Sequence, residues 1–358
     1  MKKLLLAVFS ITATFSLYAQ REVPQERMEQ IYEEVKTPYK YGLAVAPADN
    51  FHKIDCPTVF RQGDKWLMTY VVYNGKGGTD GRGYETWIAE SDNLLEWRTL
   101  GRILSYRDEK WDCNQRGGFP ALPDMEWGGS YELQTYKGRH WMTYIGGEGT
   151  GYEAVKAPLY VGLAWTKGDI STAHEWESLD KPILSIHDKD AQWWEKLTQY
   201  KSTVYWDKDK TLGAPFVMYY NAGGHHPETN LKGERVGIAL SKDMKTWKRY
   251  SGNPVFAHEA DGTITGDAHI QKMGDVYVMF YFSAFEPSRK YKAFNTFAAS
   301  YDLVNWTDWK GADLIIPSKN YDELFAHKSY MVKHDGVVYH FYCAVNNAEQ
   351  RGIAIATS

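Results

Sequence analysis

The chain has 358 residues, a formal net charge of −4 and an aromatic content of 15%, with 26 Tyr and 14 Trp. A mildly acidic protein without a basic run is not expected to bind nucleic acid. Its 3 cysteines lie far apart, which excludes a disulfide scaffold and indicates no structural zinc site.

Residues 1–19 are expected to be a signal peptide. Lys2 and Lys3 precede an apolar run that ends at Leu17, and Ala19 marks the expected cleavage position. The run is too short to span a bilayer, and no other segment is apolar enough to do so. We therefore expect a protein that is secreted across the inner membrane into the periplasm and has no membrane span.

Residues 20–50 are expected to form a short N-terminal helix and a lead-in segment. Apolar side chains recur at helical spacing between residues 26 and 35, which predicts a helix that covers the outside of the fold. These positions are Met28, Ile31, Tyr32 and Val35.

Residues 51–358 repeat one pattern five times: an extended stretch, a charged turn and a dense aromatic strand. The last tyrosines of the aromatic strands are Tyr70, Tyr144, Tyr220, Tyr281 and Tyr342. Repeats of this length with several strands each are typical of β-propellers. We therefore predict an all-β fold, a five-bladed β-propeller with a short N-terminal helix, in which residues 51–358 are the catalytic domain.

A second repeated pattern predicts four strands in each unit. A Ser and an Asp or Asn form a tight turn and are followed by a Trp that opens the next strand, as in Ser91–Trp97, Ser241–Trp247 and Ser300–Trp306. The last unit ends at its third strand, Ile353–Ser358. Two interpretations of Tyr41–Ala46 remain open: it supplies the missing fourth strand and closes the ring, or it packs nearby as a lead-in.

The innermost strands of a propeller begin around a central funnel, where side chains from all blades converge. Alignment of the five copies places these ionisable residues at the openings: Asp55, Glu132, Lys201, Asp267, His327 and Lys328. Three carboxylates around one funnel suit hydrolysis of a glycosidic bond, because one protonates the leaving oxygen, another activates water or attacks the sugar, and a third tunes the acid. One acidic residue at a strand start is more often a turn residue, so the prediction depends on all three.

The motif Asp55–Arg61, followed by the aromatic strand 66–70, resembles the five-bladed propeller glycoside hydrolases, a group that includes families 43, 62, 32, 68, 117 and 130. Family 43 enzymes open their first blade with Asp-Pro-Ser-Val and use the Asp as a general base. In this sequence, Cys56 separates the Asp from the Pro. The resemblance implies that Asp55 is the base, and that Glu132 and Asp267 are the acid and the tuning group in either order.

Family 117 resembles an arrangement in which a His is the acid, a role that His327 or His269 could fill. The alternative for His327 is a surface pair with a nearby carboxylate. The residues expected to bind substrate are Arg82, Glu85, Trp87, Arg116, Lys201, His269 and Lys328. We predict no metal ligands and no required cofactor, although the resemblance allows a structural calcium ion in the channel.

The leading hypothesis is an exported glycosidase that cleaves plant or algal oligosaccharides at chain ends with inversion. The first alternative is a glycoside phosphorylase of similar fold, in which Lys201, Lys328, Arg116 and His226 hold phosphate. The second is a non-catalytic carbohydrate-binding propeller. The sequence does not determine the oligomeric state. For the base, we expect Asp55→Asn to reduce turnover by orders of magnitude and to leave the fold intact.

Overall fold

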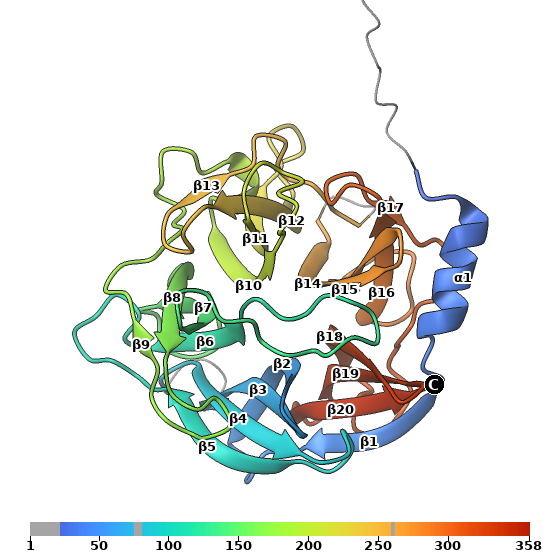
Figure 1. Cartoon of the computed structure of the whole chain (residues 1–358), viewed down its shortest axis with the longest axis horizontal. Helices are drawn as coiled ribbons and strands as arrows, with labels where there is room; N and C mark the ends of the chain where they lie inside the picture. The colour runs from blue at the N-terminus through green and yellow to red at the C-terminus, as the bar shows by residue number, and fades with distance from the viewer. Residues whose placement is uncertain (1–21, 75–80, 259–261) are drawn as a thin grey trace, which may run out of the picture.

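Five four-stranded antiparallel sheets surround a central axis in the described part of the protein (Figure 1). The computed structural model describes residues 22–74, 81–258 and 262–358. The prediction of an all-β, five-bladed β-propeller with a short helix near the N terminus is confirmed.

The first four blades each use four consecutive strands, ordered from the axis outward. Blade one contains β2 (His52–Gln62), β3 (Lys65–Asn74), β4 (Glu85–Ser91) and β5 (Arg98–Leu104). Blade two contains β6 (Gln115–Pro120), β7 (His140–Gly147), β8 (Tyr160–Thr166) and β9 (Glu177–Ser178). Blade three contains β10 (Thr198–Trp206), β11 (Phe216–His225), β12 (Lys232–Ser241) and β13 (Trp247–Arg249), preceded by the short 3₁₀ helix η1 (Trp193–Glu195). Blade four contains β14 (Ile264–Met273), β15 (Val276–Ala284), β16 (Ala293–Ser300) and β17 (Thr307–Asp308).

Blade five joins the two ends of the chain. It contains β18 (Phe325–His334), β19 (Val337–Val345), β20 (Arg351–Thr357) and, outermost, β1 (Tyr39–Val45). Strand β1 pairs with β20 in antiparallel register from Tyr39↔Thr357 to Val45↔Ile353. Of the two interpretations of Tyr41–Ala46, closure of the ring is confirmed, and the propeller sheets therefore include residues before 51. This pairing removes the lone edge that β20 would otherwise present.

The repeated Ser turn connects neighbouring blades. In blade one, the backbone N–H of Leu94 donates to Ser91 Oγ at 2.9 Å, and the indole of Trp97 donates to the Leu94 carbonyl at 3.0 Å. The Trp97 ring then meets Phe341 of blade five edge-on, with ring centroids 5.7 Å apart. The turn thus orients a large ring to cover the adjacent sheet, as the sequence pattern predicts.

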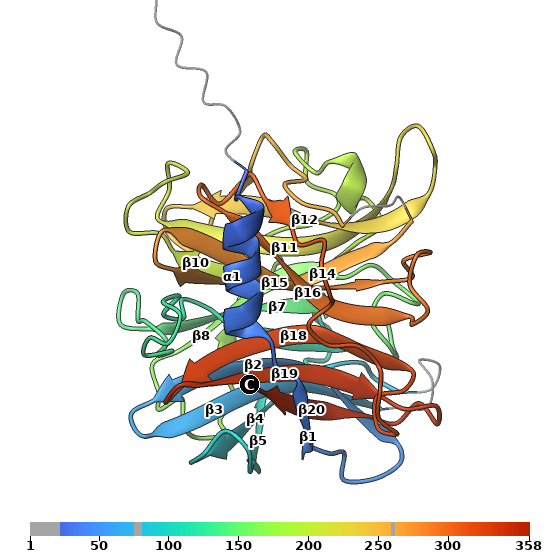
Figure 2. The ribbon, with the colours of Figure 1, turned by 90° about the vertical axis from the view of Figure 1, so that its right-hand side faces the viewer.

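Helix α1 (Gln25–Val35) lies against the outer side of the ring, beside blades four and five (Figure 2). It buries Met28, Ile31 and Val35, and Tyr32 stacks on Trp309 of blade four with centroids 5.1 Å apart. These are the four apolar positions of the predicted helix face, so that prediction is confirmed. The expected signal peptide, residues 1–19, lies outside the described residues. No helix within the described ranges is long and apolar enough to cross a bilayer.

One end of the central channel is covered by the crossing loop, which we define as residues 121–139, between β6 and β7 (Figure 1). Its backbone bonds to inner strands of other blades: Leu122 N donates to Val204 O at 2.8 Å, and Trp127 N donates to Lys272 O at 2.9 Å. The side-chain hydroxyl of Tyr131 accepts a bond from the backbone N–H of Lys333 at 2.8 Å. These contacts lie near the ends of the inner strands, so the opposite end, where these strands begin, is the one available for a pocket.

Candidate active site

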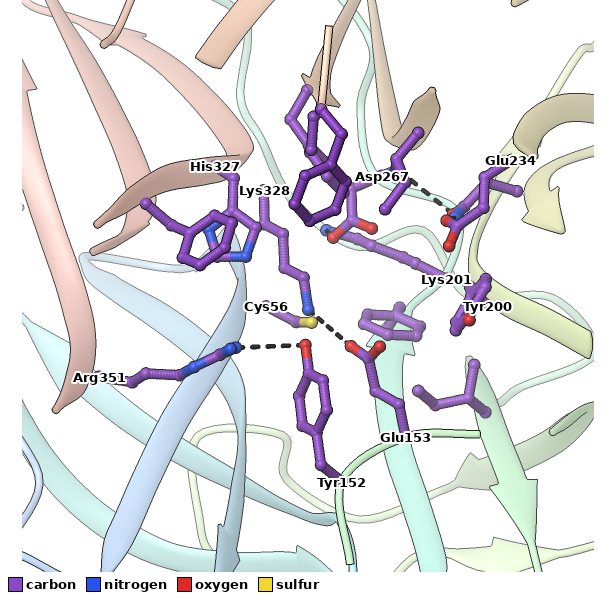
Figure 3. Close-up of a pocket in the computed structure, with 18 of the residues that line it drawn as sticks. Cys56, Tyr152, Glu153, Tyr200, Lys201, Glu234, Asp267, His327, Lys328 and Arg351 are labelled. Carbon is purple, nitrogen blue, oxygen red and sulfur yellow. Dashed lines mark hydrogen bonds and ion pairs between the residues drawn. The ribbon is translucent and has the colours of Figure 1, made fainter. Parts of the chain in front are cut away.

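A cavity of ≈ 300 Å³ lies where the innermost strands begin (Figure 3). All five blades contribute to its wall, which combines aromatic side chains with ionisable ones. The polar lining residues are Cys56, Tyr152, Glu153, Tyr200, Lys201, Asn221, Lys232, Glu234, Asp267, His327, Lys328 and Arg351. An enclosed pocket with a few converging polar groups is the usual form of a small-molecule site.

Bulges at one level of the inner strands aim side chains into this cavity. The pairing register shifts between Asp55 and Thr58 in β2, and the same irregularity recurs in β10, β14 and β18. Within three of the bulges, Cys56, Asp267 and Lys328 have φ of 54°, 56° and 60°. A bulge redirects a side chain, and a left-handed conformation at a residue other than glycine is strained, so both features mark a functional region.

Glu153 reaches the cavity from the loop between β7 and β8. Its Oε1 accepts hydrogen bonds from Lys328 Nζ and from the hydroxyl of Tyr84, each at 2.9 Å. Figure 3 shows the Lys328 side chain extending across the cavity to this carboxylate. A positive charge therefore faces Glu153 inside an enclosed site.

Asp55 lies beneath this pair and is fully buried. Its Oδ2 accepts bonds from Lys328 Nζ at 2.7 Å and from Arg351 Nη1 at 3.0 Å. Burial would raise the pKa of Asp55, but the two cations outweigh it and hold this pKa well below its ordinary value. Likewise, burial alone would lower the pKa of Lys328, whereas nearby negative charge, first that of Asp55, keeps it well above its usual value.

Glu234 enters from β12 of blade three, and its Oε2 accepts a bond from Asn221 Nδ2 at 3.1 Å. Desolvation in the enclosed cavity and the negative charge of Glu153 raise the pKa of Glu234 to about 8. This carboxyl therefore carries a proton at neutral pH. Glu153 and Glu234 point into the cavity from two different blades (Figure 3), and their environments differ: one carboxylate has a lysine partner, and the other lacks a cation in hydrogen-bonding contact within the described residues.

Asp267 and Lys201 form a third charged group in the cavity wall. Lys201 Nζ lies 3.7 Å from Asp267 Oδ2, and both side chains are almost completely buried. Burial raises the pKa of Asp267, and the nearby lysines oppose this only in part.

Four of the residues predicted from the sequence line the cavity, namely Lys201, Asp267, His327 and Lys328, and Asp55 contacts Lys328 directly. The His327 imidazole does not pair with a surface carboxylate, because it is buried and lies 3.3 Å from the carbonyl of Cys343. Burial lowers the pKa of His327 to about 3. At neutral pH the ring is therefore uncharged, which does not suit a proton donor.

Glu132 is not brought to the cavity, so the expected meeting of three carboxylates does not occur. It is exposed in the crossing loop, at the other end of the channel. The inner strand of blade two is β6, and not the stretch around Glu132 that the alignment selected. The long loop between β6 and β7 shifted the alignment, because it places the strand start far upstream of the aromatic strand.

Five residues predicted to bind substrate also lie outside the cavity lining: Arg82, Glu85, Trp87, Arg116 and His269. Most have partners elsewhere. Arg82 bonds to Asn114 and Asp108 at 2.7 Å each, and Glu85 pairs with Arg102 at 3.0 Å.

Trp87 packs into the core between blades one and five. Arg116 is fully buried and pairs with Asp112 and Glu175. His269 stacks on Tyr330 with centroids 3.8 Å apart, and burial lowers its pKa to about 3. All three therefore have structural surroundings in the blades.

Sequence reasoning missed Glu153 and Glu234, the two carboxyls that meet in the cavity. The search covered only the starts of innermost strands, whereas Glu153 lies in a loop and Glu234 lies on the third strand of its blade. One weak signal was available: Glu234 and Arg235 interrupt the otherwise apolar strand β12.

Calcium does not fit the ligand set that the described residues bring together. One group of three close metal-ligand side chains was found in the described ranges, formed by Asp55, His327 and Cys343, all buried. Calcium takes six to eight oxygen ligands, and the Asp55 oxygen that would be needed already pairs with Lys328 and Arg351. Two fixed cations next to the group also oppose binding of a metal ion.

No protein-family model matches the sequence, and no curated protein matches it. Two solved structures are 95% identical to it, each with a TM-score of 0.93 over 94% of this protein and 96% of the other; one is described as a complex of BT0996 with RGII and the other as "Glycoside hydrolase". A thermostable family-43 glycoside hydrolase has a TM-score of 0.57 at 15% identity, covering 87% of this protein and 90% of its own length. That distant likeness shows the fold alone.

The near-identical neighbours agree with the propeller architecture and with a cavity that holds two carboxyl groups in different environments. The suspected relationship to the propeller glycosidases is therefore confirmed. This protein belongs to the five-bladed β-propeller glycoside hydrolases.

Proposed function

We propose that this enzyme hydrolyses a glycosidic bond with Glu234 as the general acid and Glu153 as the second catalytic carboxylate. The observation that carries the proposal is the difference between these two groups in one cavity. The pKa of Glu234 is raised to about 8, and Glu153 faces Lys328 at 2.9 Å. Two titratable groups whose environments push their pKa values apart are typical of an acid and its partner.

In this mechanism, protonated Glu234 donates its proton to the glycosidic oxygen as the bond breaks. Glu153 acts on the opposite side of the anomeric carbon, either by activating a water or by attacking the carbon itself. Inversion, which the family resemblance implied, uses the first route and stays a prediction. Both routes need no metal, because the two carboxyl groups supply the proton transfers, so we expect EDTA to leave turnover unchanged.

The proposed substrate is RGII. A neighbour 95% identical to this protein is described as a complex with it, and the lining residues of a near-identical protein are expected to be nearly the same. A cavity of ≈ 300 Å³ accommodates about one sugar ring. We therefore propose cleavage at an end of an RGII saccharide, which narrows the expectation of a plant or algal oligosaccharide.

Incubation with purified RGII tests this function. Hydrolysis predicts release of a free sugar at a rate independent of inorganic phosphate, and NMR of the first product shows whether the anomer is inverted or retained. A phosphorylase would instead release a sugar phosphate and depend on phosphate. A non-catalytic binding protein would bind RGII without releasing anything. Either of the last two results overturns the proposal.

The phosphorylase alternative has little support in the cavity. Of the four residues suggested for phosphate, Arg116 and His226 do not line it. Lys201 and Lys328 do line it, but each faces a carboxylate.

The pH dependence of kcat/KM is expected to show a loss of activity on the alkaline side. Glu234 must carry a proton in order to act as the acid, and its pKa is raised to about 8. Above this pH, the protonated fraction falls about tenfold per pH unit. Initial rates measured on RGII between pH 5 and pH 10 test this, and constant activity up to pH 10 would contradict the assignment of the acid.

We also propose export to the periplasm, on the basis of the charged and apolar N-terminal segment at residues 1–19. Expression of the full-length protein in a Gram-negative host, followed by fractionation and N-terminal sequencing, is expected to recover protein that begins after Ala19 in the periplasmic fraction.

A further inference from the structure

The ion pair between Asp267 and Lys201 has unused hydrogen-bonding capacity. Asp267 Oδ2 is buried and has no hydrogen-bond partner among the described residues. Lys201 Nζ lies 3.7 Å away, too far for a hydrogen bond, and its one hydrogen bond within the described ranges is a long one of 3.5 Å to the carbonyl of Pro57. Asp267 and Lys201 retain only 3% and 4% exposure.

Such an arrangement is unfavourable unless something completes it. A buried polar atom without a partner destabilises the folded state, and an ammonium group has three donors to satisfy. The backbone at Asp267 is also held at φ 56° by the bulge in β14, a conformation that is strained for a residue with a side chain. Figure 3 shows the end of Lys201 beside the Asp267 carboxylate at the cavity. The missing partners can therefore come from a ligand in this cavity.

The pair is held close to the proposed acid. One side chain, that of Asn221, donates from Nδ2 to Glu234 Oε2 at 3.1 Å and accepts with Oδ1 from the backbone N–H of Asp267 at 3.3 Å. A sugar that contacts Asp267 is therefore placed next to Glu234.

A second cavity of ≈ 300 Å³ indicates where the rest of the substrate lies. It shares Glu153, Tyr200 and Lys232 with the first cavity and continues along residues 154–158. Asp267 and Lys201 line the first cavity but not the second. The scissile bond would thus lie at the carboxyls between them, with the leaving group in the second cavity.

We propose that Asp267 and Lys201 together bind two neighbouring hydroxyl groups of the sugar ring that is released. One hydroxyl donates its proton to the Asp267 carboxylate, and the oxygen of the other accepts from the Lys201 ammonium. This inference rests on the proposed glycosidase function and adds to it the residues that select the sugar. It follows that both hydroxyls must be unsubstituted, which restricts cleavage to a terminal sugar.

The test measures binding by titration calorimetry and needs no turnover. The ligands are the component monosaccharides of RGII and their single-deoxy analogues, titrated into the wild-type enzyme and into Asp267→Gly, Asp267→Asn and Lys201→Met. Glycine and asparagine are chosen because both tolerate the positive φ of Asp267. Lys201→Met removes the ammonium and keeps most of the side-chain length.

For the wild type, we expect loss of a contacted hydroxyl to weaken binding by about 10- to 100-fold, the usual effect of a hydrogen bond to a charged group. In the variant that lacks the partner of that hydroxyl, the same deoxy sugar should bind within about threefold of the parent sugar. Asp267→Asn should show an intermediate loss, because it keeps an acceptor oxygen but not the charge.

Asp322→Asn is the matched control. Asp322 is also fully buried and paired with a lysine, Lys40, but it does not line the cavity. This variant is expected to show the wild-type penalty for every deoxy sugar.

Equal penalties in the wild type and in all Asp267 and Lys201 variants overturn the inference, as does failure of every component sugar to bind. Absence of turnover on RGII would instead overturn the proposed function and leaves this binding result to be judged by itself.

Discussion

Glu234→Gln is expected to reduce kcat on RGII by about 10²- to 10⁴-fold, the usual contribution of a general acid. Glutamine has nearly the same shape and can still accept the bond from Asn221, but it has no proton to give to the leaving oxygen. The enzyme should therefore fold and bind as before. Single-turnover rates on RGII, together with calorimetric binding, measure the two properties separately.

The nature of the leaving group provides a second readout. A synthetic substrate whose leaving group is a nitrophenol needs little protonation, so its cleavage by Glu234→Gln should be reduced much less. Glu153→Gln should reduce turnover on both substrates, because activation of water or attack on the anomeric carbon is needed in each case. The control is Glu228→Gln, in the exposed loop after β11, which should retain the wild-type kcat. A Glu234→Gln enzyme with kcat within about tenfold of the wild type would exclude Glu234 as the acid.

Asp55→Asn is expected to lower the free energy of unfolding by about 3–5 kcal/mol, the usual effect of breaking a buried ion pair. Asp55 is fully buried and its Oδ2 accepts bonds from both Lys328 and Arg351. Asparagine would leave these two cations without their common counter-charge. Because Lys328 also binds Glu153, and Arg351 donates to the hydroxyl of Tyr152 at 3.2 Å, turnover should fall as well.

Urea unfolding at pH 7 measures the loss of stability, with Asp108→Asn as the control, because Asp108 forms an exposed ion pair with Arg82. The pKa of Asp55 is depressed in the folded state, so its stabilising contribution is present above the unfolded pKa of about 4 and is lost only as the pH falls further, through the folded value. An Asp55→Asn protein with an unchanged urea midpoint would contradict the buried-pair interpretation. The resemblance to family 43 led us to expect an intact fold, whereas the structure predicts loss of stability together with loss of turnover.

The fold could be predicted from the sequence because propeller blades are local. Each blade is built mainly from consecutive hairpins, so its aromatic strand and its Ser turn recur at a regular interval along the chain. The helix at Gln25–Val35 was equally accessible, since its buried face follows helical spacing. Even the closing strand β1 could be anticipated, because the fifth unit visibly lacked one strand.

The site was predicted only where it follows the same local pattern. Lys201, Asp267 and Lys328 lie in the bulges of inner strands, at the column that alignment of the repeats identified. Glu132 failed because the crossing loop separates β6 from β7 and breaks the spacing in blade two. The role of Asp55 was inferred from a motif, which carries no information about the two cations that surround it.

The sequence by itself determined the number of blades, their strand order and the level at which charged side chains approach the axis, because these depend on periodic contacts between neighbouring segments. Only the tertiary structure decided which carboxyls share the cavity. Glu153 and Glu234 come from a loop and from a third strand, and ring closure brings Arg351 and Lys328 of the last blade against Asp55 of the first. The charge environment that separates a protonated carboxyl from one paired with lysine arises from contacts between residues distant in the sequence, and no periodicity in the sequence records it.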